Sequence, residues 1–285
     1  MNKILVAGDL HHCNFTCGSG GEKRRKSRFS RRLHHFVREP LGHSYVRLVE
    51  SGLKKAGCRL VVIPAGVCGS HYRNMLKRTP KLLEKKPDWL LSSCGINDVN
   101  RVSLEEYRKN ITAILDMGEF AGIKVMLLTP PVYGEDLQEK YNREQTGYAE
   151  FLREQAAARK LLFADADKAF QQEIQHCPRK GKNNSTVDEL HLNGYRNQLL
   201  ARTVLSAFGM KEQMLERPMK EWNEIPSMIP LTNKWHDPAY LVTIPEYELL
   251  YDEVTRRKKT GYEYSLDVIR NHAAELKRRK TAVKN

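Results

Sequence analysis

The chain has 285 residues, enough for one large α/β domain with an appendage. Its composition, 40% hydrophobic and 29% charged, is typical of a soluble globular protein and excludes a collagen, a coiled coil and a wholly disordered chain. No apolar run approaches the roughly 18 residues of a membrane span. The polar start of the sequence is unlike a signal peptide, so we expect a cytoplasmic protein. The net charge of +14 indicates an anionic partner or substrate, or serves solubility alone.

Five short apolar runs predict the strands of a sheet. Each run is continuous rather than alternating, which is typical of parallel strands buried on both faces. Helical patterns lie between the runs. This β-α-β order predicts a parallel sheet with helices on both faces and right-handed crossovers. The runs are Ile4–Ala7, Leu60–Ile63, Trp89–Leu91, Val125–Leu128 and Leu161–Ala164.

A basic insertion, residues 18–42, interrupts the pattern after the first run. It opens with Gly-Ser-Gly-Gly, and between Glu22 and Glu39 it carries eight Lys or Arg and two Glu, a net charge of +6. Both a solvated loop and an anion-binding flap at the mouth of a site are consistent with this charge. We expect the insertion to be loosely packed.

The clearest helix pattern covers residues 103–121. Ser103 and Glu106 form a predicted capping box, in which each side chain accepts a backbone N–H of the first turn. Gly122 is expected to end the helix, because glycine adopts the left-handed conformation readily. The apolar face has helical spacing and consists of Leu104, Tyr107, Ile111, Ile114 and Leu115.

The last part of the chain, residues 210–285, is predicted to form a helical extension beyond a domain of residues 1–209. One helix is expected to begin at Pro245, because proline is favourable in a first turn. Another follows Ser265 and has a basic end at residues 277–280, which complements the helix dipole. The apolar row of this second helix is Leu266, Ile269, Ala273 and Leu276.

Polar clusters follow the predicted strands at the edge where ligands bind in open parallel sheets. Four such clusters come from distant parts of the sequence, and we expect them to converge on one rim of the sheet. They are Gly8–His12 after the first strand, Pro64–Ser70 after the second, Cys94–Asp98 after the third, and Asp188–Tyr195 before the last helix of the domain.

These clusters resemble the sequence blocks of the SGNH or GDSL-like hydrolase family over about residues 3–208. The most specific are Gly95-x-Asn97-Asp98 and Asp188-x-x-His191, and the stretch Pro64–Gly69 is similar to the family's Asn-Ala-Gly-Val-Ser-Gly. The resemblance implies a flavodoxin-like, three-layer α/β/α fold with a five-stranded parallel sheet of order 2-1-3-4-5. It also implies hydrolysis of ester bonds in lipids, acylated sugars, acetyl groups or thioesters.

The resemblance implies a role for each candidate site residue. His191 would be the catalytic base and Asp188 the carboxylate that orients it. The Gly69 N–H and the Asn97 amide would donate to an oxyanion, and Asp9 belongs to the first block. Physical chemistry agrees, because a carboxylate fixes the tautomer of a histidine base and an uncharged amide suits an oxygen that becomes negative. Taken alone, Asp188 and His191 are more typical of a helix-capping aspartate and a surface histidine than of a catalytic pair, and the Gly95-x-Asn97-Asp98 block favours the catalytic pair.

The first block departs from the family pattern at the nucleophile. The family has Gly-Asp-Ser there, whereas this chain has Gly8-Asp9-Leu10 and therefore no hydroxyl at that position. Three interpretations stay open: a binding protein without acyl-enzyme chemistry, direct activation of water by His191, and a substitute nucleophile such as Cys13. Loss of the nucleophile usually leaves only weak catalysis. The sequence thus predicts a hydrolase of ester or acyl bonds without its serine, or alternatively a catalytically silent binding protein.

Metal chemistry is a weaker interpretation of the same region. Asp9-x-His11 resembles the opening of calcineurin-like metallophosphoesterases, but the other motifs of that family are missing. A zinc site of His11, Cys13 and Cys17 has suitable ligands, with Cys68 and Cys94 on neighbouring strand ends, yet no CxxC pair supports it. We expect no metal, no cofactor and six reduced thiols. The thiols are those of Cys13, Cys17, Cys58, Cys68, Cys94 and Cys177.

The expected partner is a small acylated or anionic substrate, without a membrane. Nucleic acid is an alternative partner for the basic segments 23–38 and 277–280, but charge is its only support, because no standard nucleic-acid motif is present. Binding that falls steeply with salt would favour this alternative. Turnover of simple esters that is lost on His191→Ala would favour the enzyme.

Overall fold

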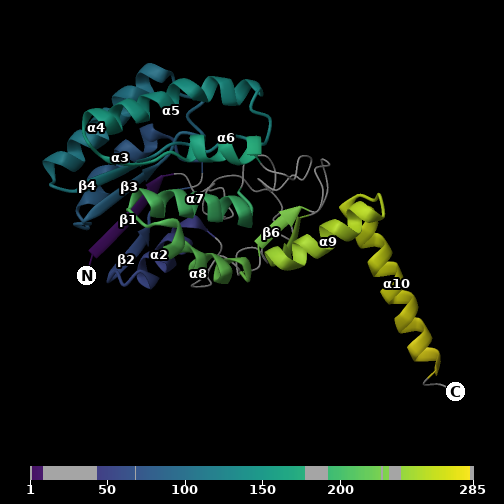
Figure 1. The fold of residues 1–285 in the computed structure, drawn as a ribbon. Coiled ribbons are helices and arrows are strands. Elements are labelled where there is room, and N and C mark those ends of the chain that lie inside the picture. Colours follow the sequence, from purple (N-terminus) through teal and green to yellow (C-terminus); the bar gives the residue numbers. More distant parts are fainter. Residues whose placement is uncertain are drawn as a thin grey trace.

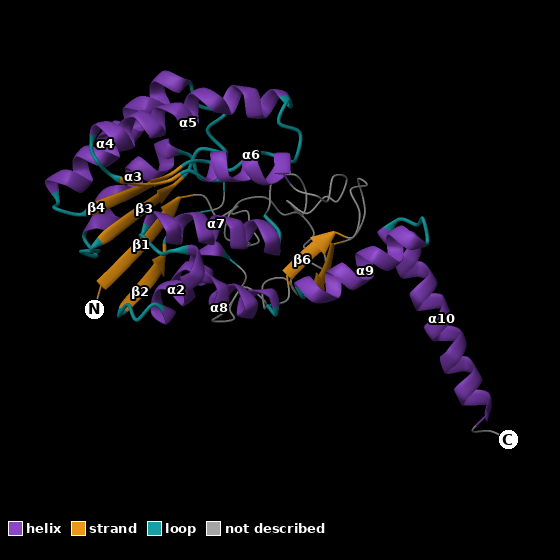
Figure 2. Ribbon diagram, in the orientation of Figure 1, coloured by secondary structure: helices purple, strands orange, loops and turns teal. Residues whose placement is uncertain are grey.

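The computed structural model describes residues 2–8, 44–67, 69–176, 192–225, 227–230 and 239–282. Its centre is a five-stranded parallel sheet of order β2-β1-β3-β4-β5, which confirms the predicted topology (Figures 1 and 2). In the register, Leu5 of β1 lies between Ile63 of β2 and Leu90 of β3. The strands are β1 (Asn2–Gly8), β2 (Leu60–Pro64), β3 (Trp89–Ser93), β4 (Lys124–Leu128) and β5 (Leu162–Ala164).

Helices cover both faces of the sheet, as the continuous apolar strands require. Successive β1 side chains alternate between two cores, because neighbouring residues of a strand point to opposite faces. Ile4 and Val6 pack with α2, α6 and α7, whereas Leu5 and Ala7 pack with α3, α4 and α5. The helices are α2 (Tyr45–Lys55), α3 (Tyr72–Leu83), α4 (Leu104–Phe120), α5 (Lys140–Ala158), α6 (Ala166–His176) and α7 (Gly194–Ala207).

Helix α4 forms where the sequence predicts it, with one difference at its start. The Ser103 side chain accepts the Glu106 N–H at 3.2 Å. The Glu106 carboxylate, however, binds the Arg73 guanidinium of α3 through both oxygens. An ion pair with a neighbouring helix has thus replaced the second half of the predicted capping box. Gly122 has a φ of +67°, which confirms that it ends the helix in the left-handed conformation.

The described residues of the C-terminal part form three helices and a two-stranded antiparallel sheet. Helix α8 places Leu215 and Trp222 in the same core as α2 and α7, and the boundary at residue 210 stays a prediction. Pro245 lies in the first turn of α9, as expected, and Thr243 and Glu246 close a capping box there. The elements are α8 (Glu212–Asn223), β6 (Ser227–Pro230), β7 (Ala239–Val242), α9 (Ile244–Arg256) and α10 (Gly261–Ala282).

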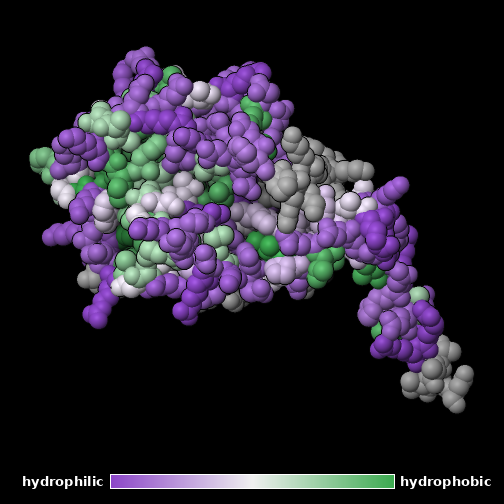
Figure 3. All heavy atoms as spheres, viewed as in Figure 1, coloured by the Kyte–Doolittle hydropathy of each residue, from purple (hydrophilic) through white to green (hydrophobic). Residues whose placement is uncertain are grey.

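Helix α10 extends away from the rest of the molecule (Figures 1 and 3). It begins at Gly261, four residues before the expected Ser265. The Ile269 side chain is 64% exposed and that of Leu276 is 46% exposed, so the predicted apolar row faces solvent rather than a core. Among the described residues, no helix combines the length and the apolar character needed to cross a bilayer.

Candidate functional site

The carboxyl ends of β1, β2 and β3 meet at one rim of the sheet. The order of the strands reverses between β1 and β3, and ligands of open α/β sheets bind at such a switch point. Gly8, the last residue of β1, lies opposite Ser93, the last residue of β3. The turns that follow β2 and β3 carry Gly69 and Asn97, so two predicted site residues lie on this rim.

Gly69 and Asn97 belong to segments that contact each other. Asn97 is only 6% exposed, and its Nδ2 donates to the Ser70 carbonyl oxygen at 3.5 Å. Gly69 has a φ of +68°, a conformation that a side chain disfavours. Gly69 adjoins Ser70, whose carbonyl accepts the Asn97 amide. The structure therefore brings into contact the two segments that carry the predicted oxyanion donors.

The turn after β3 needs glycine at its first position. Gly95 has a φ of +129°, and an added Cβ would lie 3.0 Å from Pro130 Cγ. The turn closes with hydrogen bonds from the Asp98 and Val99 N–H groups to the Gly95 carbonyl. Gly95 thus lets the chain pass Pro130 and present Asn97 at the rim.

Asp98 joins this turn to the start of α3. Its side chain is fully buried, and both carboxylate oxygens accept the Tyr72 N–H, at 3.0 and 3.3 Å. Burial raises the pKa of Asp98 to about 6, although this hydrogen bond and the nearby His71 and Arg73 act in the opposite direction. Because Asp98 follows Asn97 and Tyr72 follows the Gly69 turn, the carboxylate holds the two donor segments together.

We predict that Asp98→Asn changes the pH dependence of stability. A raised pKa means that the folded protein binds this proton more tightly than the unfolded chain, so the stabilisation is complete below pH 3.8 and is lost as the pH rises through about 6. One pKa unit corresponds to about 1.4 kcal/mol, so the difference between 3.8 and about 6 lowers the free energy of unfolding by about 3 kcal/mol over this pH range. The amide oxygen of the variant can still accept the Tyr72 N–H. Denaturant unfolding between about pH 4 and pH 7 should show the variant gaining stability relative to wild type.

The control for this prediction is Asp116→Asn on the exposed side of α4. It should follow the wild-type pH dependence. Parallel curves for wild type and Asp98→Asn across this range would mean that Asp98 does not titrate there.

The segment that follows His191 is anchored beside the start of α2. Leu192 is 1% exposed and packs in the core on the α2 and α7 face. Asn197 accepts the Tyr45 N–H at 3.0 Å and donates to the Leu192 carbonyl at the same distance. Helix α2 runs from the end of β1 back to the start of β2, so Tyr45 lies at the carboxyl rim of the sheet. The residue next to His191 is therefore held at the rim that carries Gly69 and Asn97.

Three predicted site residues, Asp9, Asp188 and His191, lie outside the described residues. So do Leu10 and the basic insertion 18–42. Their places in the site stay predictions.

A family model for the GDSL-like lipase/acylhydrolase family matches residues 15–198. The chain belongs to this family. The matched region covers Gly69, Asn97, Asp188 and His191, and it begins after Leu10, so it does not include the first block. No match was found among curated proteins.

Solved structures with the same fold include three hydrolases. An acetylxylan esterase from Geobacillus stearothermophilus superposes with a TM-score of 0.60 and 22% identity, covering 74% of this chain and 95% of the esterase. An α/β hydrolase from the metagenome of Lake Arreo, Spain, superposes with a TM-score of 0.59 and 24% identity, and the match covers 73% of this chain and 95% of the hydrolase. The acetyl xylan esterase AlAXEase superposes with a TM-score of 0.59 and 23% identity, and the match covers 72% of this chain and 98% of that esterase. At these identities the comparison establishes the fold.

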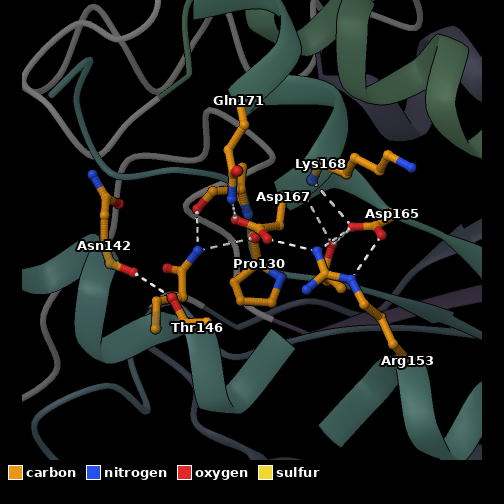
Figure 4. Close-up of polar contacts among 11 residues, drawn as sticks. Pro130, Asn142, Thr146, Arg153, Asp165, Asp167, Lys168 and Gln171 are labelled. Carbon is orange, nitrogen blue, oxygen red and sulfur yellow. Dashed lines mark hydrogen bonds and ion pairs between the residues drawn. The ribbon is translucent and has the colours of Figure 1, made fainter. Parts of the chain in front are cut away.

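The carboxyl ends of β4 and β5 carry a polar network that the sequence did not predict (Figure 4). Arg153 of α5 binds both oxygens of Asp165 at 2.8 and 2.9 Å, and it binds Asp167 at 2.6 Å. Thr129 donates to Asp165 and accepts the Asp167 N–H. Burial alone would raise the pKa of Asp165, but the hydrogen bonds, foremost those of Arg153, hold it below its ordinary value. Both carboxylates are thus engaged in fixing the start of α6.

The described residues contain no group of three or more His, Cys, Asp or Glu that could hold a metal ion. The proposed zinc ligands His11, Cys13, Cys17 and Cys68 lie outside the described part of the chain. Cys58 and Cys94 carry thiols rather than a disulfide, as expected for these two.

Sequence reasoning missed one residue that contacts the Gly69 turn, Arg78. This side chain binds the loop that carries Gly69 and Ser70. One signal was available: no Asp or Glu stands three or four residues from Arg78 in the helix, the spacing at which a helical arginine finds an ion-pair partner on its own helix.

Proposed function

We propose that this chain hydrolyses ester bonds of small acylated compounds, with His191 as the base and Asp188 as its orienting carboxylate. The Gly69 N–H and the Asn97 amide serve as the oxyanion donors. The observation that carries the proposal is the contact of Asn97 Nδ2 with the Ser70 carbonyl, which aligns the two donor segments at the switch point of a GDSL-like fold.

The proposed reaction is a one-step attack by water, because the first block has Leu10 in place of serine. His191 removes a proton from the water as its oxygen bonds to the ester carbonyl carbon. The carbonyl oxygen becomes negative and accepts hydrogen bonds from Gly69 and Asn97. When the tetrahedral intermediate collapses, the bond to the alkoxide breaks, and His191 returns its proton to the alkoxide. The products are a carboxylic acid and an alcohol, and no acyl-enzyme forms.

An acetyl group on a sugar is the substrate that we propose to test first. Two structures of similar fold are acetyl xylan esterases, and a small acyl group demands little from a pocket. The positive charge of the chain favours a substrate whose alcohol part is anionic.

Turnover of p-nitrophenyl acetate and of acetylated xylooligosaccharides tests the proposal. Wild type should release acetate above the background of buffer, and His191→Ala should not. His272→Ala on the exposed surface of α10 is the matched control and should retain wild-type turnover. Equal rates for wild type and His191→Ala would refute the proposed base.

A second candidate function is binding without turnover, and Leu10 is the observation that favours it. A site with donors but no nucleophile still attracts an anion such as a carboxylate, which resembles the charge of the tetrahedral intermediate. The comparisons give no support to nucleic acid as the partner, so the ligand considered is a small or polymeric anion. A folded wild type with no turnover of any ester would favour this function.

For either function we predict that the basic insertion increases affinity for anions. Replacing Arg24, Arg25, Arg31 and Arg32 together with glutamine removes four charges, so the variant should elute from a heparin column at lower salt. Its melting temperature should stay within about 2 °C of wild type, because solvated side chains contribute little to stability. A large fall in melting temperature would mean that these side chains belong to the core.

A further inference from the structure

Arg78 links the two ends of the loop between β2 and α3. This side chain points back towards the start of α3, as helical side chains do. Its Nη1 donates to the Ala65 carbonyl at 2.9 Å, and its Nη2 donates to Ser70 Oγ at 2.9 Å. Ala65 is the first residue after β2, and its N–H donates to the Val6 carbonyl of β1 at 2.8 Å. One rigid guanidinium therefore ties the loop to the edge of the sheet at one end and to Ser70 at the other.

The Arg78 contacts continue to the oxyanion donors. Ser70 is 2% exposed, and its carbonyl oxygen accepts the Asn97 amide. Gly69 precedes Ser70 and has a left-handed backbone, so the two residues belong to one turn, which Arg78 contacts through the Ser70 hydroxyl. The guanidinium thus binds the one residue that accepts the Asn97 amide and adjoins Gly69.

Among the described residues, nothing neutralises the charge of Arg78. None of the described carboxylates forms an ion pair with it, and among the described residues its buried Nε–H has no acceptor. By contrast Arg73, five residues earlier on the same helix, is exposed and pairs with Glu106. Burial lowers the pKa of Arg78. A half-buried guanidinium that binds only neutral acceptors among the described residues is costly, and negative charge that develops at the neighbouring donors would offset that cost.

We propose that Arg78 is a positioning residue that holds the Gly69 and Asn97 donors in place and stabilises the charge they receive. The inference rests on the proposed function for its kinetic part only. Its geometric part is that the Arg78 guanidinium clamps residues 65–70 by binding Ala65 and Ser70. This part does not depend on whether the protein is an enzyme.

The kinetic test compares Arg78→Met and Arg78→Lys with the matched control Arg73→Met. Arg78→Met should lower kcat for p-nitrophenyl acetate by about 10- to 100-fold, less than the loss of a direct donor, while KM changes little. Arg78→Lys keeps the positive charge but cannot make both guanidinium hydrogen bonds, so its kcat should lie between those of Arg78→Met and wild type. Arg73→Met should keep kcat within about twofold, because exposed ion pairs contribute little. A further variant, Arg78→Ala, should lose at least as much kcat as Arg78→Met, and added guanidinium ion should restore part of it.

The geometric test measures hydrogen exchange of the Ser70 amide, which donates to the Val67 carbonyl at 3.1 Å. Exchange should be at least about tenfold faster in Arg78→Met and unchanged in Arg73→Met. If wild type has no esterase activity, the proposed function fails, and exchange at Ser70 alone then decides the clamp. Unchanged exchange of the Ser70 amide in Arg78→Met, or a folded Arg78→Met with the kcat of an active wild type, would overturn the inference.

Discussion

Replacing Asn97 with alanine should lower kcat for ester hydrolysis by about 100- to 1000-fold, the usual cost of one oxyanion donor. The Asn97 amide is buried and directed to the Ser70 carbonyl, so it is already oriented before substrate binds. A preoriented donor acts mainly on the transition state, and KM should therefore change little. Steady-state kinetics with p-nitrophenyl acetate gives both constants.

Asn271→Ala is the control for Asn97→Ala, because Asn271 is an exposed asparagine on α10. It should leave kcat unchanged. A kcat within about threefold of wild type for Asn97→Ala, in a variant that folds, would remove Asn97 from the site.

Replacing Leu10 with serine should increase turnover of a small activated ester by about 100-fold or more. In the family pattern this position carries the nucleophile, and a serine there would give its proton to His191 and form an acyl-enzyme that water then hydrolyses. Adding His191→Ala should remove the gain. The assay uses wild type, Leu10→Ser and the double variant, each checked for folding by circular dichroism.

The alternative for Leu10 is that it fills an apolar pocket that has replaced the nucleophile site. A hydroxyl buried there without a partner would cost about 1–3 kcal/mol and give no chemistry. A well-folded Leu10→Ser with no activity on any acyl chain length would show that the remaining groups are not arranged for a serine.

The parallel sheet could be predicted from sequence because its strands are continuous apolar runs. Two of these runs, Val125–Leu128 and Leu60–Ile63, contain no polar side chain that would need a hydrogen-bond partner or water. Such runs occur where both faces of a strand are covered. The small sheet of β6 and β7 gave no such signal, because its strands have four residues each and β6 ends in a proline. Short strands of this kind depend on tertiary contacts more than on their own pattern.

The candidate site could be predicted in part. Gly69 and Asn97 were predicted from their motifs and lie together, because backbone turns at strand ends are specified locally by glycine and by the strand order. The contacts of Arg78 and of the Arg153 network could not be predicted. The lack of an acidic residue near Arg78 on its own helix indicates a distant partner, but nothing in the sequence identifies which residue that partner is. The same limit explains Glu106, whose partner is on another helix rather than in its own first turn.

A crystal structure of the chain tests the central claim most directly, namely that the four polar clusters form one catalytic site. We expect the His191 imidazole and the Asn97 amide to face the same opening at the carboxyl rim, with the Gly69 N–H beside them and Asp188 bound to the other nitrogen of His191. A His191 side chain on a different edge of the domain, or one that faces away from Asn97, would contradict the account.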